Sequence, residues 1–255
     1  MRTTSRKGVT LIEIMVVIAI IGVLTTLSIA SYQQIGTASA PRNAVNDLTA
    51  QLIRARTRAA ESQADVWFII YPTFHKRTLT NPAANAATGG PGAYFLFEDR
   101  AMTFNTNAGL STEVYYRPAA AGVDFDPVAD TLVGSTSVEG RFIDAIYLDE
   151  YAGQNVSIAL PVGGVTMVAK DAPFAGMPVA TACTFCSGTP LRGAVVFSPD
   201  GSARFIDGDG NSVGASGGTA VSRAHGIAVK NFKDTRVYVV GVSAPTAYIA
   251  AYDKR

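Results

Sequence analysis

The sequence predicts an α+β fold in which one long N-terminal α-helix packs on a mostly antiparallel β-sheet or β-sandwich head. Three observations support this fold. An apolar run follows the first residues, a helical stripe of apolar residues comes next, and the remainder consists of short β-branched or aromatic segments bounded by turn residues. The 24 glycines and 12 prolines fit strands and turns, and 255 residues suffice for one head domain with its own core.

The first helical segment has the length and composition of a membrane span. A basic leader with Arg2, Arg6 and Lys7 ends at Gly8, and the apolar run from Val9 to Ala30 carries a single charge, Glu13. As a helix these 22 residues rise about 33 Å. A carboxylate in a bilayer costs a few kcal/mol, so Glu13 is a candidate functional residue. The basic leader predicts a cytoplasmic N-terminus.

The second helical segment is amphipathic. Between Arg42 and Ala64 the apolar residues step by 3, 4, 3 and 4 along one face, at Val45, Leu48, Leu52, Ala55 and Ala59. Most polar residues fall on the other side, at Asn46, Asp47, Arg54, Arg58 and Glu61. Pro41 either starts this segment or kinks a continuous helix. We expect the apolar stripe to lie against a sheet.

Beyond Gln63 the pattern changes to that of short strands. We predict strands at Val66–Tyr71, Tyr94–Phe97, Glu113–Arg117, Asn155–Leu160, Val165–Val168, Ala194–Ser198, Ala203–Asp207, Gly226–Lys230, Val237–Val242 and Ala247–Tyr252. Ser198-Pro199-Asp200-Gly201 predicts a tight turn that joins a hairpin. Loops are expected at Asn81–Gly92, Pro118–Gly122 and Gly208–Thr219.

The leader, Gly8, the apolar run and Glu13 together resemble the type III signal of type IV prepilins and type II secretion pseudopilins. The resemblance implies that a prepilin peptidase cuts between Gly8 and Val9 and methylates Val9, and that Glu13 acts in assembly. Most members have Phe where this chain has Val9. An ordinary secretory signal, cut after Ser28-Ile29-Ala30, and a simple membrane anchor are the alternatives, and neither explains Gly8 or Glu13.

The segments Asn43–Ala59 and Val195–Ser202 make the chain similar to the GspH/FimT family of minor pseudopilins and minor pilins, which have one long helix and a β-sandwich-like head. The expected organisation is a leader at 1–8, a transmembrane or filament-core helix half at 9–30, an amphipathic half at 31–64 and a β-rich periplasmic or extracellular head at 65–255. The implied partners are the prepilin peptidase, other major and minor pilins or pseudopilins, the inner membrane and the assembly platform. Extra length is expected in Asn81–Gly92, Gly122–Tyr151 or Lys170–Leu191.

Cys183 and Cys186 have C-x-x-C spacing. A zinc site would need two more soft or imidazole ligands, and the chain has no second cysteine pair. A thioredoxin-like motif would begin a helix in a βαβ unit, and the sequence around these cysteines does not have that pattern. A local disulfide that braces the Ala172–Pro190 loop is the favoured interpretation, because an exported head lies in an oxidising compartment.

Two glycine-rich stretches resemble known site motifs. Asp207, Asp209 and Asn211 have the spacing that begins a calcium loop, but the downstream Glu is absent and the glycine falls one place early, so a turn is favoured. Gly214–Gly218 matches G-x-S-x-G, which requires a preceding strand and a following helix, so a loop is favoured. The two histidines, His75 and His225, are expected to be packing or surface residues. No cofactor is predicted.

Charge argues against nucleic acid as a partner. The formal net charge is +1, and loss of the three basic leader residues leaves the side chains at −2. Some members of the GspH/FimT family, which the chain resembles, bind DNA through a basic C-terminal stretch of the Gly-Arg-x-Arg type. Here only Lys254 and Arg255 remain, at a terminus that we expect to fray. The resemblance to prepilins and pseudopilins implies a structural assembly protein and not an enzyme. The competing class is an exported β-rich hydrolase or binding protein with an ordinary signal.

Overall fold

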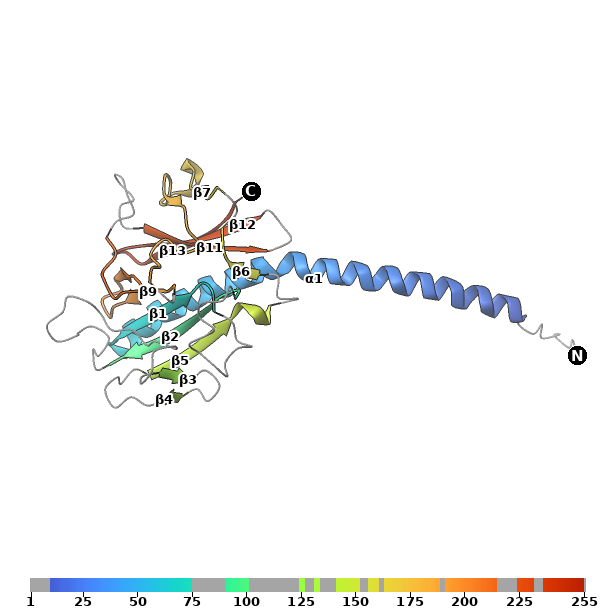
Figure 1. Ribbon diagram of the computed structural model, residues 1–255, viewed down its shortest axis with the longest axis horizontal. Helices are drawn as coiled ribbons and strands as arrows, with labels where there is room; N and C mark the ends of the chain where they lie inside the picture. The colour runs from blue at the N-terminus through green and yellow to red at the C-terminus, as the bar shows by residue number, and fades with distance from the viewer. Residues whose placement is uncertain are drawn as a thin grey trace, which may run out of the picture. The chain divides into compact units, whose positions relative to one another are not determined.

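The computed structural model describes residues 10–74, 90–100, 124–126, 131–133, 141–151, 156–160, 163–188, 191–214, 224–231 and 236–254. The chain divides into two compact units, Met1–Ser39 and Ala40–Arg255, each of which is described by itself. One helix, α1 (Leu11–Ser62), contributes to both units (Figure 1). Pro41 lies within this helix.

The second unit contains two antiparallel sheets. The first sheet has the strand order β10-β9-β1-β2-β5, and the second has the order β13-β12-β11-β6 (Figure 1). The first comprises β1 (Asp65–Tyr71), β2 (Ala93–Asp99), β5 (Arg141–Tyr147), β9 (Gly193–Phe197) and β10 (Ala203–Ile206). The second comprises β6 (Val156–Ile158), β11 (Ala224–Asn231), β12 (Val237–Ser243) and β13 (Tyr248–Lys254). Smaller elements are the hairpins β3 (Asp124–Asp126) with β4 (Thr131–Val133) and β7 (Val165–Thr166) with β8 (Pro178–Val179), and the 3-10 turns η2 (Leu148–Glu150) and η4 (Ala169–Asp171).

The C-terminal half of α1 packs against both sheets. The predicted stripe is confirmed: its five residues, Val45, Leu48, Leu52, Ala55 and Ala59, are all at most 2% exposed. They share one hydrophobic core with Phe68 and Leu96 of the first sheet and Ile227 and Val240 of the second. Residues every third or fourth position along a helix lie on one face, so this spacing places a single apolar surface toward the sheets.

Three arginines at every second position of α1 bond to the sheets on either side of the helix. Arg54 pairs with Asp144 of β5 at 2.7 Å, and Arg58 pairs with Glu98 of β2 at 2.8 Å, so both reach the first sheet. Arg56 instead donates to the carbonyl oxygen of Ala247, beside β13, at 3.3 Å. The polar side of the helix therefore contributes directed contacts to both sheets as well as a solvated surface.

The outer face of each sheet is also apolar. In the first sheet this face is aromatic, with Trp67, Tyr71, Phe95, Phe97 and Tyr147 buried in one cluster. On the second sheet, Met167, Phe174 and Met177 from the segment around η4 pack against Ala228 and Val239. Each sheet thus has side chains packed on both faces.

The predicted turn at 198–201 is confirmed. Gly201 N–H donates to the Ser198 carbonyl oxygen at 2.9 Å, and β9 and β10 pair antiparallel on either side. Gly201 has φ +81°, a conformation that glycine adopts without a steric penalty.

Eight predicted strands correspond to β1, β2, β6, β9, β10, β11, β12 and β13. Strand β5 lies in the Gly122–Tyr151 segment and was not predicted. The strand expected at Val165–Val168 is shorter than predicted: β7 ends at Thr166 because Val168 N–H donates to the Asp171 carboxylate at 2.8 Å and η4 begins. The predicted strand Glu113–Arg117, the loop Pro118–Gly122 and most of the loop Asn81–Gly92 lie outside the described residues.

Candidate functional site

The first described turn of α1 holds Glu13 in a capping box. Thr10 precedes the helix, and both its backbone N–H and its hydroxyl donate to Glu13 Oε2, at 2.8 Å and 2.9 Å. In return, Glu13 N–H donates to Thr10 Oγ1 at 3.4 Å. This reciprocal pair satisfies N–H groups that a helix start leaves without partners. The Thr-x-x-Glu spacing of Thr10 and Glu13 is the sequence signal for such a box, which was not predicted.

The helix beyond Glu13 presents an uninterrupted apolar surface within the first unit. Leu11–Ile29 is long and apolar enough to cross a membrane, with a mean hydropathy of 2.5 and no buried side chain. An N-terminal signal sequence has the same properties, so this criterion does not separate the two. Glu13 is the only charged residue in this stretch.

The few hydroxyl groups in this stretch bond back to the helix itself. Thr26 donates to the Val23 carbonyl oxygen and Ser28 to the Leu24 carbonyl oxygen, both at 2.8 Å, and Thr25 donates to Ile21. Hydroxyls that are satisfied within the helix suit an apolar surrounding, where water is unavailable. Gly8 and Val9 lie outside the described residues.

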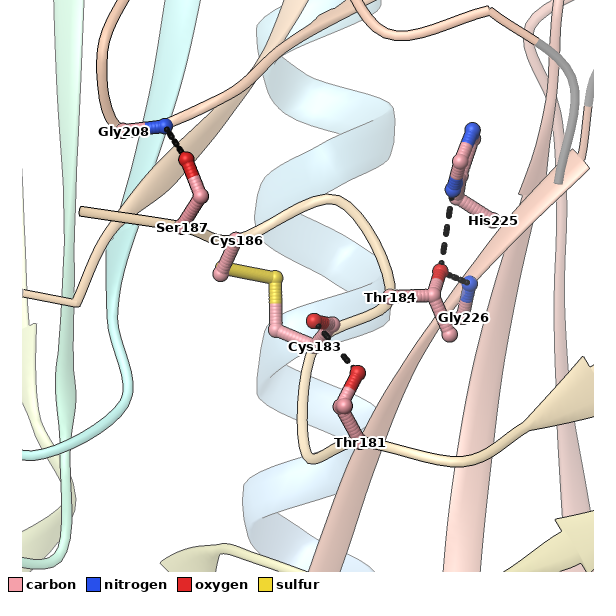
Figure 2. Close-up of a disulfide and its surroundings, with 8 residues drawn as sticks. All are labelled: Thr181, Cys183, Thr184, Cys186, Ser187, Gly208, His225 and Gly226. Atoms are coloured by element: carbon pink, nitrogen blue, oxygen red, sulfur yellow. Dashed lines mark hydrogen bonds between the residues drawn. A yellow bond between two sulfur atoms is a disulfide. The ribbon is translucent and has the colours of Figure 1, made fainter.

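The two cysteines form the predicted disulfide. Cys183 and Cys186 are bonded, with their Cα atoms 5.3 Å apart. Their loop lies in the Lys170–Leu191 segment and contacts strands of both sheets. Figure 2 shows the disulfide bond of Cys183 and Cys186. On one side of it, Thr184 faces His225 and Gly226, and on the other side Ser187 faces Gly208.

The calcium candidate forms a turn after β10. Asp207 Oδ1 accepts the backbone N–H groups of Asp209 at 2.9 Å and Asn211 at 2.8 Å. The Asn211 amide also lies 3.4 Å from Asp207 Oδ2. The predicted turn is therefore present, and the Asp207 carboxylate serves as its cap. Among the residues that the structure describes, no group of three His, Cys, Asp or Glu side chains is placed to hold a metal ion.

His225 is a packing residue, as predicted. Its ring is 1% exposed and lies 4.4 Å from the Phe205 ring centroid. Nε2 lies 3.3 Å from the Gly214 carbonyl oxygen, which can only accept, so Nε2 carries the hydrogen and Nδ1 accepts from the Thr184 hydroxyl at 3.0 Å. Burial lowers the pKa of His225. Of the Gly214–Gly218 motif only Gly214 lies within the described residues, and His75 lies outside them.

The C-terminus is not frayed at Lys254, contrary to expectation. Lys254 closes β13, is 9% exposed and forms an ion pair with the buried carboxylate of Asp171. That partner comes from η4, far away in sequence, so the charge is held within the head. Arg255 lies outside the described residues.

Comparison with protein families identifies the N-terminal segment. Residues 3–29 match the prokaryotic N-terminal methylation motif. Comparison of the chain with curated proteins and with solved structures finds no match. The matched segment contains Arg6 and Lys7 of the basic leader, Gly8, Glu13 and the apolar stretch of α1, and the structure adds one long helix followed by antiparallel sheets. The N-terminal segment therefore carries a type IV pilin-like prepilin signal, and the α+β architecture that follows is consistent with a type IV pilin-like fold.

Proposed function

We propose that the chain is a minor pilin or pseudopilin of the GspH/FimT kind, which joins or primes an envelope filament of a type IV pilus or a type II secretion system. One observation carries the proposal: the methylation motif at residues 3–29 coincides with a helix whose apolar stretch bears a single carboxylate, Glu13. Its role is structural, through contacts with neighbouring major and minor pilins or pseudopilins and with the assembly platform.

The proposed topology follows from the charges around α1. The basic leader stays in the cytoplasm, the apolar helix crosses the bacterial inner membrane once, and the β-rich head lies in the periplasm before it enters the filament. A prepilin peptidase cuts between Gly8 and Val9 and methylates Val9. Intact-mass and N-terminal analysis of the mature protein should show a methylated Val9, whereas a start at Ser31 would establish an ordinary secretory signal.

Glu13 is proposed to pair with the Val9 amine of a neighbouring subunit. Cleavage creates that amine close to Glu13 in sequence. In a packed filament core both charges lose water, and an unpaired buried charge costs several kcal/mol. Pairing across subunits offsets this loss and sets the axial register. The Thr10 hydrogen bonds hold the carboxylate at the helix start until a neighbour supplies the amine.

Substitutions separate this role from helix capping. Glu13→Gln keeps an oxygen that can accept from Thr10 but removes the charge, and Thr10→Val removes the hydroxyl but keeps the carboxylate. We expect Glu13→Gln and Glu13→Ala to retain membrane levels and leader cleavage but to lose recovery in sheared filaments or assembly complexes. Thr10→Val should still be incorporated. Normal incorporation of Glu13→Gln, with loss for Thr10→Val, would assign Glu13 to capping alone.

A further inference from the structure

The loop at residues 182–187 touches both sheets of the head. On one side it continues the edge of β11: Thr184 N–H donates to the Gly226 carbonyl oxygen at 3.0 Å, and Ala228 N–H donates to the Ala182 carbonyl oxygen at 2.8 Å. Gly226 N–H also donates to Thr184 Oγ1 at 2.9 Å. The loop therefore acts as a short additional strand beside the second sheet.

The other end of the loop is bonded to residues that flank β9 and β10 of the first sheet. Ser187 and Arg192, the residue before β9, exchange two backbone hydrogen bonds of 2.9 Å and 3.1 Å. The Ser187 hydroxyl accepts from Gly208 N–H, just after β10, at 2.9 Å. The Arg192 guanidinium in turn donates to the Gly208 carbonyl oxygen. Thus only residues 185 and 186 separate the contact with β11 from the contact with β9 and β10.

Between these two contacts the loop is packed tightly. Phe185 is 2% exposed, and its ring lies 5.2 Å from that of Phe205 on β10. A methyl group at Gly193 of β9 would lie 2.7 Å from the Phe185 ring and 3.1 Å from Cys186 Sγ. The Cys186 side of the disulfide therefore lies directly against Gly193 of the first sheet. Cys183, on the other side of the bond, forms a β-bridge with Ile227 of the second sheet.

We propose that the Cys183–Cys186 disulfide makes loop 182–187 an oxidation-dependent clip that fastens the second sheet to the first. Figure 2 shows the bond between the two contacts, with Gly208 on one side and His225 and Gly226 on the other. A ring this short constrains the unfolded chain less than a long one. Its main effect is to hold the two sets of hydrogen bonds at a fixed separation, since a reduced loop pays more conformational entropy to make both.

Exposure sets the order of the oxidation. Cys183 is 2% exposed, whereas Cys186 is half-buried, so an external disulfide meets Cys186 first. The Cys186 thiolate attacks that disulfide and releases one thiol of the oxidant. The Cys183 thiolate then attacks Cys186 Sγ and releases the second. Two electrons and two protons pass from the cysteines to the oxidant, a thiol–disulfide oxidoreductase or a small disulfide. The clip concerns the head alone and does not depend on the filament assignment.

Hydrogen exchange of the full chain in detergent tests the clip through four amides: Gly226 and Ala228 on one side, Arg192 and Gly208 on the other. Reduction, or the double substitution Cys183→Ser/Cys186→Ser, should raise exchange at all four at least tenfold and leave β12 unchanged. A change confined to residues 182–187 would overturn the clip. Loss of protection throughout the head would also overturn it, because the disulfide would then serve folding as a whole.

A second measurement asks whether one contact senses the other. Thr184→Val removes the hydroxyl that accepts from Gly226, far from Gly208. In the oxidised chain we expect this change to raise exchange at Gly208 about threefold or more, and in the reduced chain to have no effect there. The matched control is Thr181→Val, because Thr181 donates to the Cys183 carbonyl oxygen and the structure gives its hydroxyl no bond to either sheet. Equal responses to the two substitutions at Gly208 would exclude transmission through the disulfide.

Discussion

Glu98 is a fully buried carboxylate with two arginine partners. Arg58 of α1 and Arg100 both form ion pairs with it, while its own side chain has no exposed area. Burial by itself would raise the pKa of Glu98, but hydrogen bonds and positive charge from Arg100 and Arg58 outweigh burial, and the pKa is lowered. The charged form is therefore favoured in the folded head, and its contribution to stability is lost as the pH falls through the folded pKa.

Glu98→Gln should lower the free energy of unfolding by about 1 to 3 kcal/mol, because two charge-assisted hydrogen bonds lose their acceptor charge. Arg100→Gln should cost less than about 1 kcal/mol, since the Arg100 side chain is 61% exposed and water replaces the partner. Urea unfolding followed by the fluorescence of Trp67, the only tryptophan and a buried one, measures both. Equal losses of unfolding free energy for the two variants would show that the burial of Glu98 does not determine how much these ion pairs stabilise the head.

His225 should make the head less stable in mild acid. Its folded pKa is lowered by burial, so below about pH 6.5 the unfolded chain binds a proton more readily than the folded one. Stability should fall as the pH drops through about 6.5 and level off below the folded pKa. The loss is about 1.4 kcal/mol for each unit by which the pKa is lowered.

The test compares the pH dependence of unfolding in the wild type and in His225→Asn, between pH 7.5 and 5. The variant should show a flatter profile, because the titrating ring is gone from the pocket formed by Thr184, Phe185, Phe205 and Gly214. His75→Asn serves as the control for a change of histidine alone. Parallel profiles for wild type and His225→Asn would exclude His225 as the cause.

At the scale of elements, neighbouring residues on the two faces of α1 differ sharply in solvent exposure. Leu52 is fully buried in the core shared by both sheets, whereas Ile53 is 51% exposed. Leu52→Ala should lower the free energy of unfolding by about 2 to 5 kcal/mol, from lost burial and the remaining cavity. Ile53→Ala should change it by less than about 0.5 kcal/mol. Comparable losses in denaturant unfolding would contradict the packing of α1 on the sheets.

Periodicity predicted the elements whose residues repeat regularly, and the structure explains where it failed. The stripe from Val45 to Ala59 has a clear helical period, whereas the strands around Trp67 and Val195 are continuous apolar runs that are buried on both faces and bounded by turn residues. β5 includes Asp144, which faces Arg54, and its register with β2 shifts between Leu96 and Phe97, so its apolar pattern is interrupted. β8 has only two residues and depends on its partner β7 rather than on its own sequence.

At the scale of the whole molecule, local motifs were more informative than contacts distant in sequence. The prepilin signal, the disulfide and the turns are each contained in one continuous segment of the chain. By contrast, the contacts of the disulfide loop join Thr184 to Gly226 and Ser187 to Gly208, and Lys254 meets Asp171. No pattern within either segment specifies such pairs, because tertiary packing creates them. For this reason the fraying expected at Lys254 was wrong.

The division of the chain into two units predicts that the second unit, Ala40–Arg255, folds without the first unit, Met1–Ser39. Every buried hydrophobic residue among those described lies at Ala40 or later, and no side chain of Leu11–Ile29 is buried. A chain that begins at Ala40 keeps the whole α1 stripe and both sheets, and loses the exposed apolar surface of Leu11–Ile29. It should therefore fold in buffer without detergent, form the Cys183–Cys186 disulfide and melt within a few degrees of the full chain measured in detergent. The full chain without detergent should associate through its apolar helix. Circular dichroism, sizing and thiol counting test this expectation. A truncated chain with a native-like melting transition but two free thiols would contradict the proposed oxidation of an autonomous head, and one without a cooperative transition would show that residues 1–39 contribute to the fold of the second unit.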